Sequence, residues 1–248
     1  MVKSGMENQR AFKAPVYTSY RQVFSALGNQ GLLGFYKGNG LGLFHLFMTN
    51  NLKFQVIWPT QKNALLKHEE MSDGMRFLYY TVTGCVVDSI FQPLHVLQSR
   101  FILQNRLAKF YTYKSVIGAF KKHITSGGLG EFWQGNLANL PKNMILGGAF
   151  DQNTLTMNPV FWFATVVGSA WMVYPFLTVQ RRLECQSEVG GMIKKRYSGV
   201  IHALRLVKQE EGVRGLYRGF AGFLMVNSLV TLAAFYTMFG VLYDIDLV

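Results

Sequence analysis

Four polar side chains interrupt apolar stretches of the sequence and could take part in binding. They are His45, Asp88, and Lys142 with its neighbour Asn143. Polar and ionisable side chains within such runs are costly, so they point to a function or to a specific partner. Two interpretations remain open. The residues either contact a solute, or they are residual polarity in which Lys142 extends to an interface or pairs with Asp88.

Catalytic chemistry is not indicated. The sequence contains no Ser/His/Asp constellation and no cluster with metal-ligand spacing, and Cys85 and Cys185 lie far apart. Its glycine-rich phrases lack the Lys-Ser/Thr pair of a nucleotide-binding loop. A net charge of +12 would suit nucleic acid, but the basic residues do not fall in a recognisable binding module. We therefore expect no enzyme activity, no metal, no cofactor and no nucleic-acid partner.

The elements that would position these side chains read as membrane spans, each of which needs about 20 mostly apolar residues. Half of the 248 residues are hydrophobic and only 15% are charged, and basic stretches alternate with apolar ones. The predicted spans are 39–59, 75–97, 137–156, 159–180 and 220–242. The span 137–156 contains Pro141, Lys142 and Asp151, so its prediction depends on repeat symmetry more than on hydropathy.

Positive charge is concentrated in three segments. Residues 1–38, 98–135 and 180–219 hold 5, 6 and 9 of the 25 lysine and arginine residues, respectively. Because lysine and arginine favour the inner side of a membrane, the three segments are expected on one side. With five spans, the N-terminus then lies inside and the C-terminus outside.

Each basic segment ends in a similar phrase bounded by glycines. The three copies run from Gly31 to Gly38, from Gly128 to Gly135 and from Gly212 to Gly219. A tyrosine followed by an amphipathic helix precedes each copy, at Tyr17, Tyr113 and Tyr197. Three copies in register indicate a threefold repeat. We expect one domain with an incomplete first repeat at 1–60, a second at 75–156 and a third at 159–248.

The third copy resembles the mitochondrial carrier family. Arg196-Tyr197-Ser198-Gly199, followed by Glu210 to Gly219, is close to the family pattern for the end of a repeat. The resemblance covers nearly the whole chain. It implies an all-α membrane protein with a threefold pseudo-repeat, here with five transmembrane helices plus three short matrix helices. It also implies the mitochondrial inner membrane, with the N-terminus in the matrix and the C-terminus in the intermembrane space.

The chain departs from that family at the positions that close the pore. In the family, each odd helix ends in Pro-x-Asp/Glu-x-x-Lys/Arg-x-Lys/Arg, and these charges form an interhelix ring on the matrix side. The corresponding positions here are Pro93, His95 and Gln98, and Pro175, Leu177 and Gln180. The acidic positions and their basic partners are thus replaced, so we expect no ring and no network at these residues. The acid–base motif on the cytosolic side of the even helices also fails.

The family pattern implies where a solute would bind. In carriers, the even helices contact the solute about seven residues after the closing glycine. That position falls on His45, on Lys142 with Asn143 beside it, and next to Asn227. Lys194, Lys195 and Arg196 form a basic patch that either binds cardiolipin headgroups or is a solvated loop.

The absent gates favour a non-transporting role. Only 16 residues precede Tyr17, so the first odd helix is expected to be missing. We therefore expect an accessory or structural subunit of a large inner-membrane complex of the respiratory type. Membrane lipid or another subunit would pack near 39–59 and 220–242. A divergent mitochondrial solute transporter is the main alternative, and a scrambling or docking platform is the third.

Overall fold

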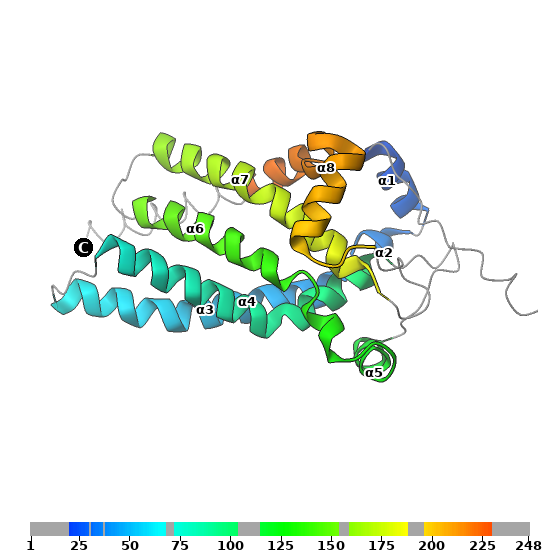
Figure 1. The fold of residues 1–248 in the computed structure, drawn as a ribbon, viewed down its shortest axis with the longest axis horizontal. Helices are drawn as coiled ribbons and strands as arrows, with labels where there is room; N and C mark the ends of the chain where they lie inside the picture. Colours follow the sequence, from blue (N-terminus) through cyan, green and yellow to red (C-terminus); the bar gives the residue numbers. More distant parts are fainter. Residues whose placement is uncertain are drawn as a thin grey trace, which may run out of the picture. The chain divides into compact units, whose positions relative to one another are not determined.

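In a computed structural model of the chain, the regular elements are helices (Figure 1). The structure describes residues 20–29, 31–36, 38–67, 72–103, 115–153, 159–187 and 196–229. The helices that form most of the predicted spans are α3 (Asn39–Lys67), α4 (Asp73–Leu103), α6 (Asn139–Asn153) and α7 (Pro159–Cys185). The other helices are α1 (Tyr20–Gly28), α2 (Leu32–Phe35), α5 (Val116–Ser126), η1 (Leu129–Trp133), η2 (Asn136–Ala138) and α8 (Val200–Leu216). A further apolar helix covers Phe220–Leu229. Over the described residues, the prediction of an all-α fold is confirmed.

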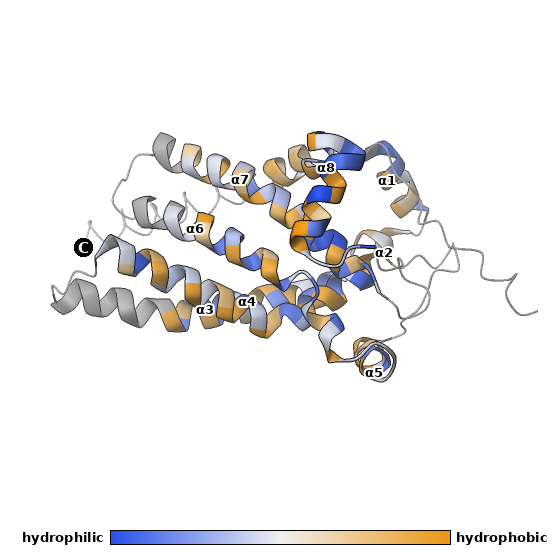
Figure 2. Ribbon diagram, in the orientation of Figure 1, coloured by the Kyte–Doolittle hydropathy of each residue, from blue (hydrophilic) through white to orange (hydrophobic). Residues whose placement is uncertain are grey.

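Four predicted spans coincide with α3, α4, α6 and α7, and 220–229 is the described part of the fifth. Among the residues described, Phe163–Cys185 is the one helix whose length and hydropathy suit a membrane crossing. Helix α4 is longer, with 31 residues, but it carries Arg76, Asp88 and Arg100. Figure 2 shows the resulting mixture of hydrophobic and hydrophilic turns along the helices. The number of spans and their place in a membrane stay predictions, as does the division into three repeats.

The glycine-bounded phrases share a backbone conformation. The first and last glycine of every copy have positive φ, at Gly31, Gly38, Gly128, Gly135, Gly212 and Gly219. Side chains with a Cβ rarely adopt this conformation, so glycine is required where the chain turns there. The turn at Gly128 separates α5 from η1, and Gly212 interrupts α8 with a φ of 70°. The three copies therefore share a local structure as well as a sequence pattern.

The described chain falls into two compact units. The first lies within residues 1–46, 93–134 and 184–196, and the second within 47–92, 135–183 and 197–248. A buried cluster of Leu97, Ala119 and Phe132 forms the core of the first unit and joins α4 to α5 and η1.

The second unit contains a core of the same design. Val179, Ala203 and Leu216 are buried there and join α7 to α8. Ala203 lies as many residues after Ala119 as Gly219 lies after Gly135, and the same spacing separates Leu216 from Phe132. Equivalent positions of two sequence copies thus perform the same packing task.

Helix α4 is apolar outside and polar inside along its first half. Leu78, Val82, Val86 and Ile90, each about one turn from the next, are all more than half exposed. Asp88 and Gln92 are buried, at 8% and 2% exposed. This is the reverse of a water-soluble helix, and it places the chemistry of α4 on its packed face.

Candidate functional site

A buried aspartate in the second unit joins three helices. Asp88 of α4 accepts contacts from Lys53 of α3 at 2.6 Å and from Lys142 of α6 at 2.7 Å, one at each carboxylate oxygen. The lysine side chains are 28% and 18% exposed, and that of Asp88 is 9% exposed. A carboxylate this buried requires such compensation, because desolvation penalises an unpaired charge heavily. We call Lys53, Asp88, Lys142 and Asn143 the Asp88 cluster.

Asn143 completes the Asp88 cluster from the same helix as Lys142. Its Nδ2 donates to Asp88 Oδ2 at 3.0 Å and lies 3.7 Å from the Cys85 sulfur. Gly84 makes room for this amide, since a Cβ at position 84 would lie 2.6 Å from Asn143 Oδ1. The close approach of α4 and α6 thus depends on a small residue.

Asn139 extends the polar network toward the Pro175 motif. Its Oδ1 accepts from Lys142 Nζ at 2.7 Å and from Gln180 Nε2 of α7 at 3.2 Å. Its Nδ2 donates to Gln92 Oε1 of α4 at 3.2 Å. Asn139, Gln92 and Gln180 are each at most 2% exposed. One amide therefore connects α4, α6 and α7, and this hub touches the Asp88 cluster through Lys142.

A second polar constellation lies in the first unit. His95 Nδ1 is 2.6 Å from Glu184 Oε1, and Ser99 Oγ donates to Glu184 Oε2 at 2.7 Å. Glu184 is completely buried in the last turn of α7. The imidazole of His45 on α3 stands beside His95, with ring centroids 5.1 Å apart. Side chains from three helices thus meet around one buried carboxylate.

The neighbouring Arg100 cluster consists of Arg100, His123 and Glu131. Arg100 is completely buried, and its Nη1 lies 3.1 Å from Glu131 Oε2 and 2.9 Å from the ring nitrogens of His123. His123 Nδ1 lies 2.9 Å from the same Glu131 oxygen. Arg100 also donates to the backbone carbonyls of Glu184 at 2.9 Å and Gln186 at 3.1 Å. It therefore ties the end of α7 to α4 and α5.

His123 is held as the neutral imidazole. Burial, assisted by the positive charge of Arg100, lowers the pKa of His123 to about 4. A neutral ring donates from Nδ1 to Glu131 and accepts from Arg100 at Nε2, which satisfies all three partners. The ring also packs edge-on against Phe132, at a centroid distance of 5.6 Å. Its role in this buried position is structural.

The equivalent ion pair of the third copy is built differently. Arg182, at the position of Arg100, pairs with Glu211, whose Oε2 lies 2.7 Å from Arg182 Nη2. Glu211 and Gly215 occupy the positions held by Gly127 and Glu131 in the second copy. A Cβ at Gly127 would lie 2.6 Å from Glu131 Cδ. The glutamate and the glycine have thus exchanged places, and in each copy the glycine leaves room for the acid.

Other predicted site residues have separate environments. Asn227 Nδ2 donates to the Phe223 carbonyl of its own helix at 2.8 Å. Leu177 is half-buried in α7, and a Cβ at Gly42 of α3 would overlap the Gln98 amide. Arg196 is exposed, and its backbone N–H donates to Gln186 Oε1 at 3.0 Å. Lys194 and Lys195 lie outside the described residues.

Comparison with known proteins identifies the family. Residues 71–150 and 151–242 match the family model described as mitochondrial carrier protein. The chain belongs to the mitochondrial carrier family. The resemblance inferred from the third phrase is therefore confirmed, and the matched region contains both Pro motifs.

Three relatives show how similar this chain is in sequence to other proteins of the family. An ADP,ATP carrier protein of Parachlorella kessleri is 25% identical over 88% of this chain and 67% of its own length. A mitochondrial carnitine/acylcarnitine carrier-like protein of Arabidopsis thaliana is 26% identical over 89% of this chain and 81% of its own. The mouse mitochondrial adenyl nucleotide antiporter SLC25A24 is 24% identical over 82% of this chain, which spans 45% of that protein.

One prediction about the carrier-family gate is wrong. We expected no network at the degenerate positions, but His95 contacts Glu184 and Gln180 contacts Asn139. Position 95, where the family pattern has an acid, holds the base His95. Its partner is the acid Glu184, one turn beyond Gln180. When one residue of a packed contact is replaced, the residue that it contacts is commonly replaced as well. A fixed motif template does not capture such paired replacements. Pro93 and Pro175 lie inside the continuous helices α4 and α7.

The sequence predicted the positions of the polar site residues better than it predicted their ion-pair partners. It placed Lys142 and Asn143 as a site and offered Asp88 as a partner for Lys142, which the structure bears out. It did not pair Lys53 with Asp88, nor single out Glu184. A signal existed for Glu131, since it is the one acidic residue in the basic segment 98–135.

Proposed function

We propose that this carrier-family chain is a divergent solute transporter of the mitochondrial inner membrane, and that the Asp88 cluster carries its solute site. Supporting this is one observation: two lysines and an aspartate from three helices form one ion cluster on the packed face of α4. Transporters commonly place polar residues of this kind at facing helices within the bilayer. The relatives whose names state a solute are an ADP,ATP carrier, an adenyl nucleotide antiporter and a carnitine/acylcarnitine carrier-like protein.

The charge of the Asp88 cluster suggests the solute class. Two ammonium groups share one carboxylate, which leaves a net positive charge of one. A small organic anion binds there by taking Lys142 from Asp88, with the amide of Asn143 beside it. Since the exchange replaces one carboxylate partner with another, it does not require a lysine to stand unpaired in the interior.

The accessory role loses one of its reasons. It was inferred from a missing first helix and two missing sets of gate contacts, yet His95 and Gln180, on the matrix side, each contact another helix. A carrier needs two states of similar energy, each held by its own contacts. Contacts at these two positions suit such a cycle, so an accessory subunit becomes the outcome that the experiment below would reveal.

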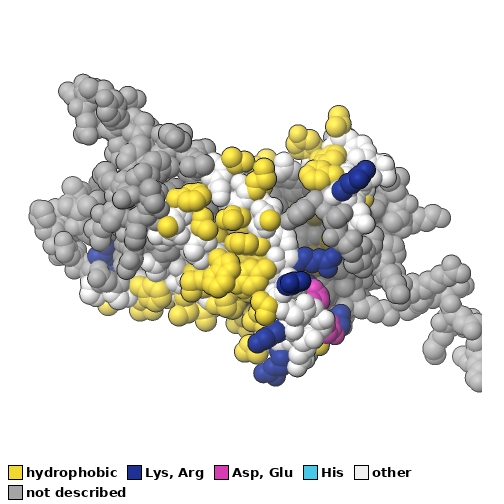
Figure 3. Space-filling view, turned by 90° about the horizontal axis from the view of Figure 1, so that it is seen from above, with side chains coloured by type: hydrophobic (Ala, Val, Ile, Leu, Met, Phe, Trp, Pro, Cys, Tyr) yellow, Lys and Arg dark blue, Asp and Glu magenta, His cyan; other side chains and the backbone are white. Residues whose placement is uncertain are grey.

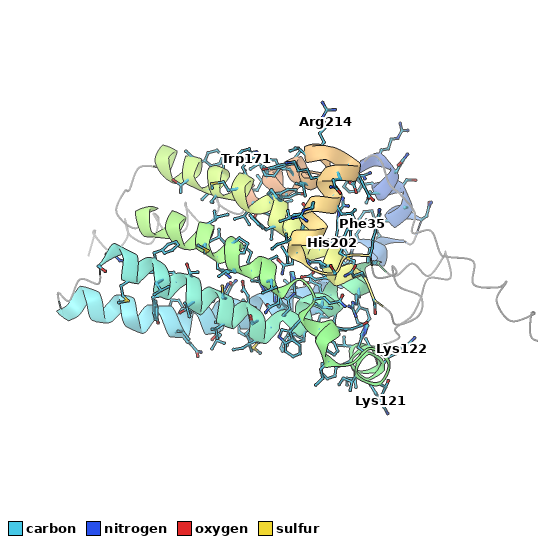
Figure 4. The ribbon with its side chains drawn as sticks, in the orientation of Figure 1. Phe35, Lys121, Lys122, Trp171, His202 and Arg214 are labelled. Atoms are coloured by element: carbon cyan, nitrogen blue, oxygen red, sulfur yellow. The ribbon has the colours of Figure 1, made fainter. Side chains whose placement is uncertain are left out.

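Membrane placement is consistent with the surfaces. The exposed stripe Leu78, Val82, Val86 and Ile90 suits lipid, and Figure 3 shows hydrophobic side chains gathered over one face. We place the basic segments 98–135 and 180–219 in the matrix. Lys121 and Lys122 project from α5 and Arg214 from α8 (Figure 4), where they meet water or anionic lipid. Arg196, with Lys194 and Lys195, is the proposed contact for cardiolipin headgroups.

Ligand-dependent stability tests the site. The full chain in lipid nanodiscs is heated with nucleotides, phosphate, carboxylates or carnitine, because a bound solute raises the unfolding temperature with its concentration. We expect at least one anion to stabilise wild type and Lys142→Arg but not Lys142→Gln. Arg214→Gln, a loss of the same charge at an exposed site, is the matched control. Absence of any stabilisation, with migration in one large complex on a native gel, would support the accessory subunit instead.

A further inference from the structure

Two buried hydroxyl groups of the second unit lack a hydrogen-bond partner within the described part of the chain. They are Thr49 Oγ1 of α3 and Thr81 Oγ1 of α4, and the two threonines are 6% and 5% exposed. Most buried polar groups in folded proteins are hydrogen-bonded, and an unpaired one costs stability. A buried hydroxyl of this kind therefore points to a partner from outside the chain.

Thr49 lies beside the Asp88 cluster. It precedes Lys53 by four residues in α3, so the two side chains share one face of that helix. Lys53 Nζ lies 2.6 Å from Asp88 Oδ1 of α4, which shows that this face packs against α4. The threonine is thus about one helical turn, or about 5.4 Å along α3, from a lysine of the proposed solute site.

Thr81 has a different environment. A Cβ at Gly147 of α6 would lie 3.1 Å from Thr81 Oγ1, so this hydroxyl is packed into the contact between α4 and α6. Seven residues, about two turns of α4, separate it from Asp88. Thr81 therefore occupies a packing position, and Thr49 is the hydroxyl next to a charged group.

The depth of these groups defines what can bind. The lysines of the Asp88 cluster are partly exposed, whereas Thr49 is buried. A solute therefore meets the ammonium groups with its anionic end and reaches the threonine with its other end. A hydroxyl at that end can donate to Thr49 Oγ1 or accept from it, and a methyl group can do neither.

We propose that Thr49 is a specificity-determining residue, which selects organic anions carrying a hydroxyl group about one helical turn, or roughly 5 Å, from the carboxylate. The carboxylate binds the ammonium groups of the Asp88 cluster, and the hydroxyl pairs with Thr49 Oγ1. A site built to hydrogen-bond a hydroxyl rejects the analogue that lacks it, because the polar group of the site then stays unpaired. The selectivity rests on the proposed function, whereas the unpaired hydroxyl of the solute-free chain does not.

Unfolding of the solute-free full chain in nanodiscs tests whether the hydroxyl is unpaired. Thr49→Val keeps the shape of the side chain and replaces the hydroxyl by a methyl group. We expect it to raise the unfolding temperature by about 2–4 °C, because a buried polar group without a partner is removed. Thr125→Val should cause no such rise, since the exposed Thr125 hydroxyl already donates to the Lys121 carbonyl at 3.0 Å. A lower unfolding temperature for Thr49→Val would overturn the proposal.

Solute binding in the same nanodiscs tests the selectivity. The probes are 4-hydroxybutyrate and butyrate, which differ in one terminal hydroxyl, and affinity is measured from the rise of the unfolding temperature with concentration. Wild type and Thr49→Ser should bind 4-hydroxybutyrate at least about tenfold more tightly than butyrate. Thr49→Val should bind the two anions equally. Thr81→Val, the same change at the packing position, should keep the preference of wild type.

The outcomes separate this proposal from the proposed function. Equal binding of the two probes by wild type, or a preference that survives in Thr49→Val, would overturn the role of Thr49. If neither probe stabilises wild type but another anion does, the hydroxyl selectivity fails and the solute site stands. If no anion stabilises wild type, the proposed function and the selectivity fail together, and the unfolding temperature of Thr49→Val still shows whether the hydroxyl is unpaired.

Discussion

At the scale of single residues, the two complete copies solve one problem in two ways. An arginine near the end of α4 or α7, Arg100 buried and Arg182 partly exposed, pairs with an acid from the segment that follows. The third copy supplies the acid from Glu211, and the second from Glu131, one turn later. In each copy, a glycine stands at the position where the other copy has its acid. The acidic side chain fills the space that a side chain at the glycine position would need.

This exchange predicts a rescue. Glu131→Gly removes one partner of the buried Arg100 and should lower the free energy of unfolding by about 3 kcal/mol. Adding Gly127→Glu in the same chain recreates the arrangement of the third copy and should recover more than half of that loss, as measured by denaturant unfolding in detergent. Gly127→Glu alone should destabilise, because its Cβ would overlap the Glu131 carboxyl. A double variant no more stable than Glu131→Gly would refute the exchange.

His123 predicts acid sensitivity at the same place. Its pKa is lowered to about 4 from an ordinary 6.5, so the unfolded chain takes up this proton first as pH falls. Stability from His123 is therefore complete above pH 6.5 and is lost between pH 6.5 and 4, by up to about 3 kcal/mol. His123→Gln should flatten the fall in unfolding free energy across that window. The same slope in wild type and variant would show that the pKa of His123 is not lowered in the folded protein.

At the scale of helices, amide side chains take the place of charges as links. Asn139 joins α6 to Gln92 of α4 and to Gln180 of α7. Each partner is buried, so removing the Asn139 amide takes one hydrogen-bond partner from each of the others. A lost hydrogen bond to a buried polar group costs about 1–3 kcal/mol.

Two asparagines of different connectivity test this linkage. Asn139→Ala should lower the unfolding free energy by about 2–4 kcal/mol, since it removes one hydrogen-bond partner from each of Gln92, Gln180 and Lys142. Asn227→Ala removes the same side chain from a site where its amide contacts its own helix, and should change stability by less than about 1 kcal/mol. Thermal and denaturant unfolding measure both. Equal losses would mean that Asn139 does not connect helices.

How far the sequence predicts this structure differs between backbone and side chains. The glycine phrases and apolar runs correctly predicted helices at α3, α4, α6, α7, α5 and α8, because periodicity and positive-φ glycines are local signals. The pairing of Lys142 with Asp88, one of the two interpretations offered for that lysine, is also confirmed. The contact of His95 with Glu184 could not be predicted, because it joins residues far apart in sequence and replaces the family's acid with a base. Pairing across helices is a property of packing, which a single sequence does not display.

At the scale of the whole molecule, we propose a carrier whose buried polar contacts differ from the family pattern. In the second unit, the Asp88 cluster holds one net positive charge on the packed face of α4. In the first unit, His95 and Glu184 join α4 to α7 within the Pro93 motif.

Uptake of anions into liposomes decides whether this chain transports a solute at the Asp88 cluster. The purified full chain is reconstituted, and labelled anions are supplied outside, with each variant shown to be folded by its unfolding temperature. We expect saturable uptake of an organic anion by wild type, Lys142→Arg and Arg214→Gln, and a loss of at least about tenfold in Lys142→Gln, as a removed ion pair of about 1.4 kcal/mol would give. Folded wild type that takes up none of the anions, or uptake unchanged in Lys142→Gln, would contradict it.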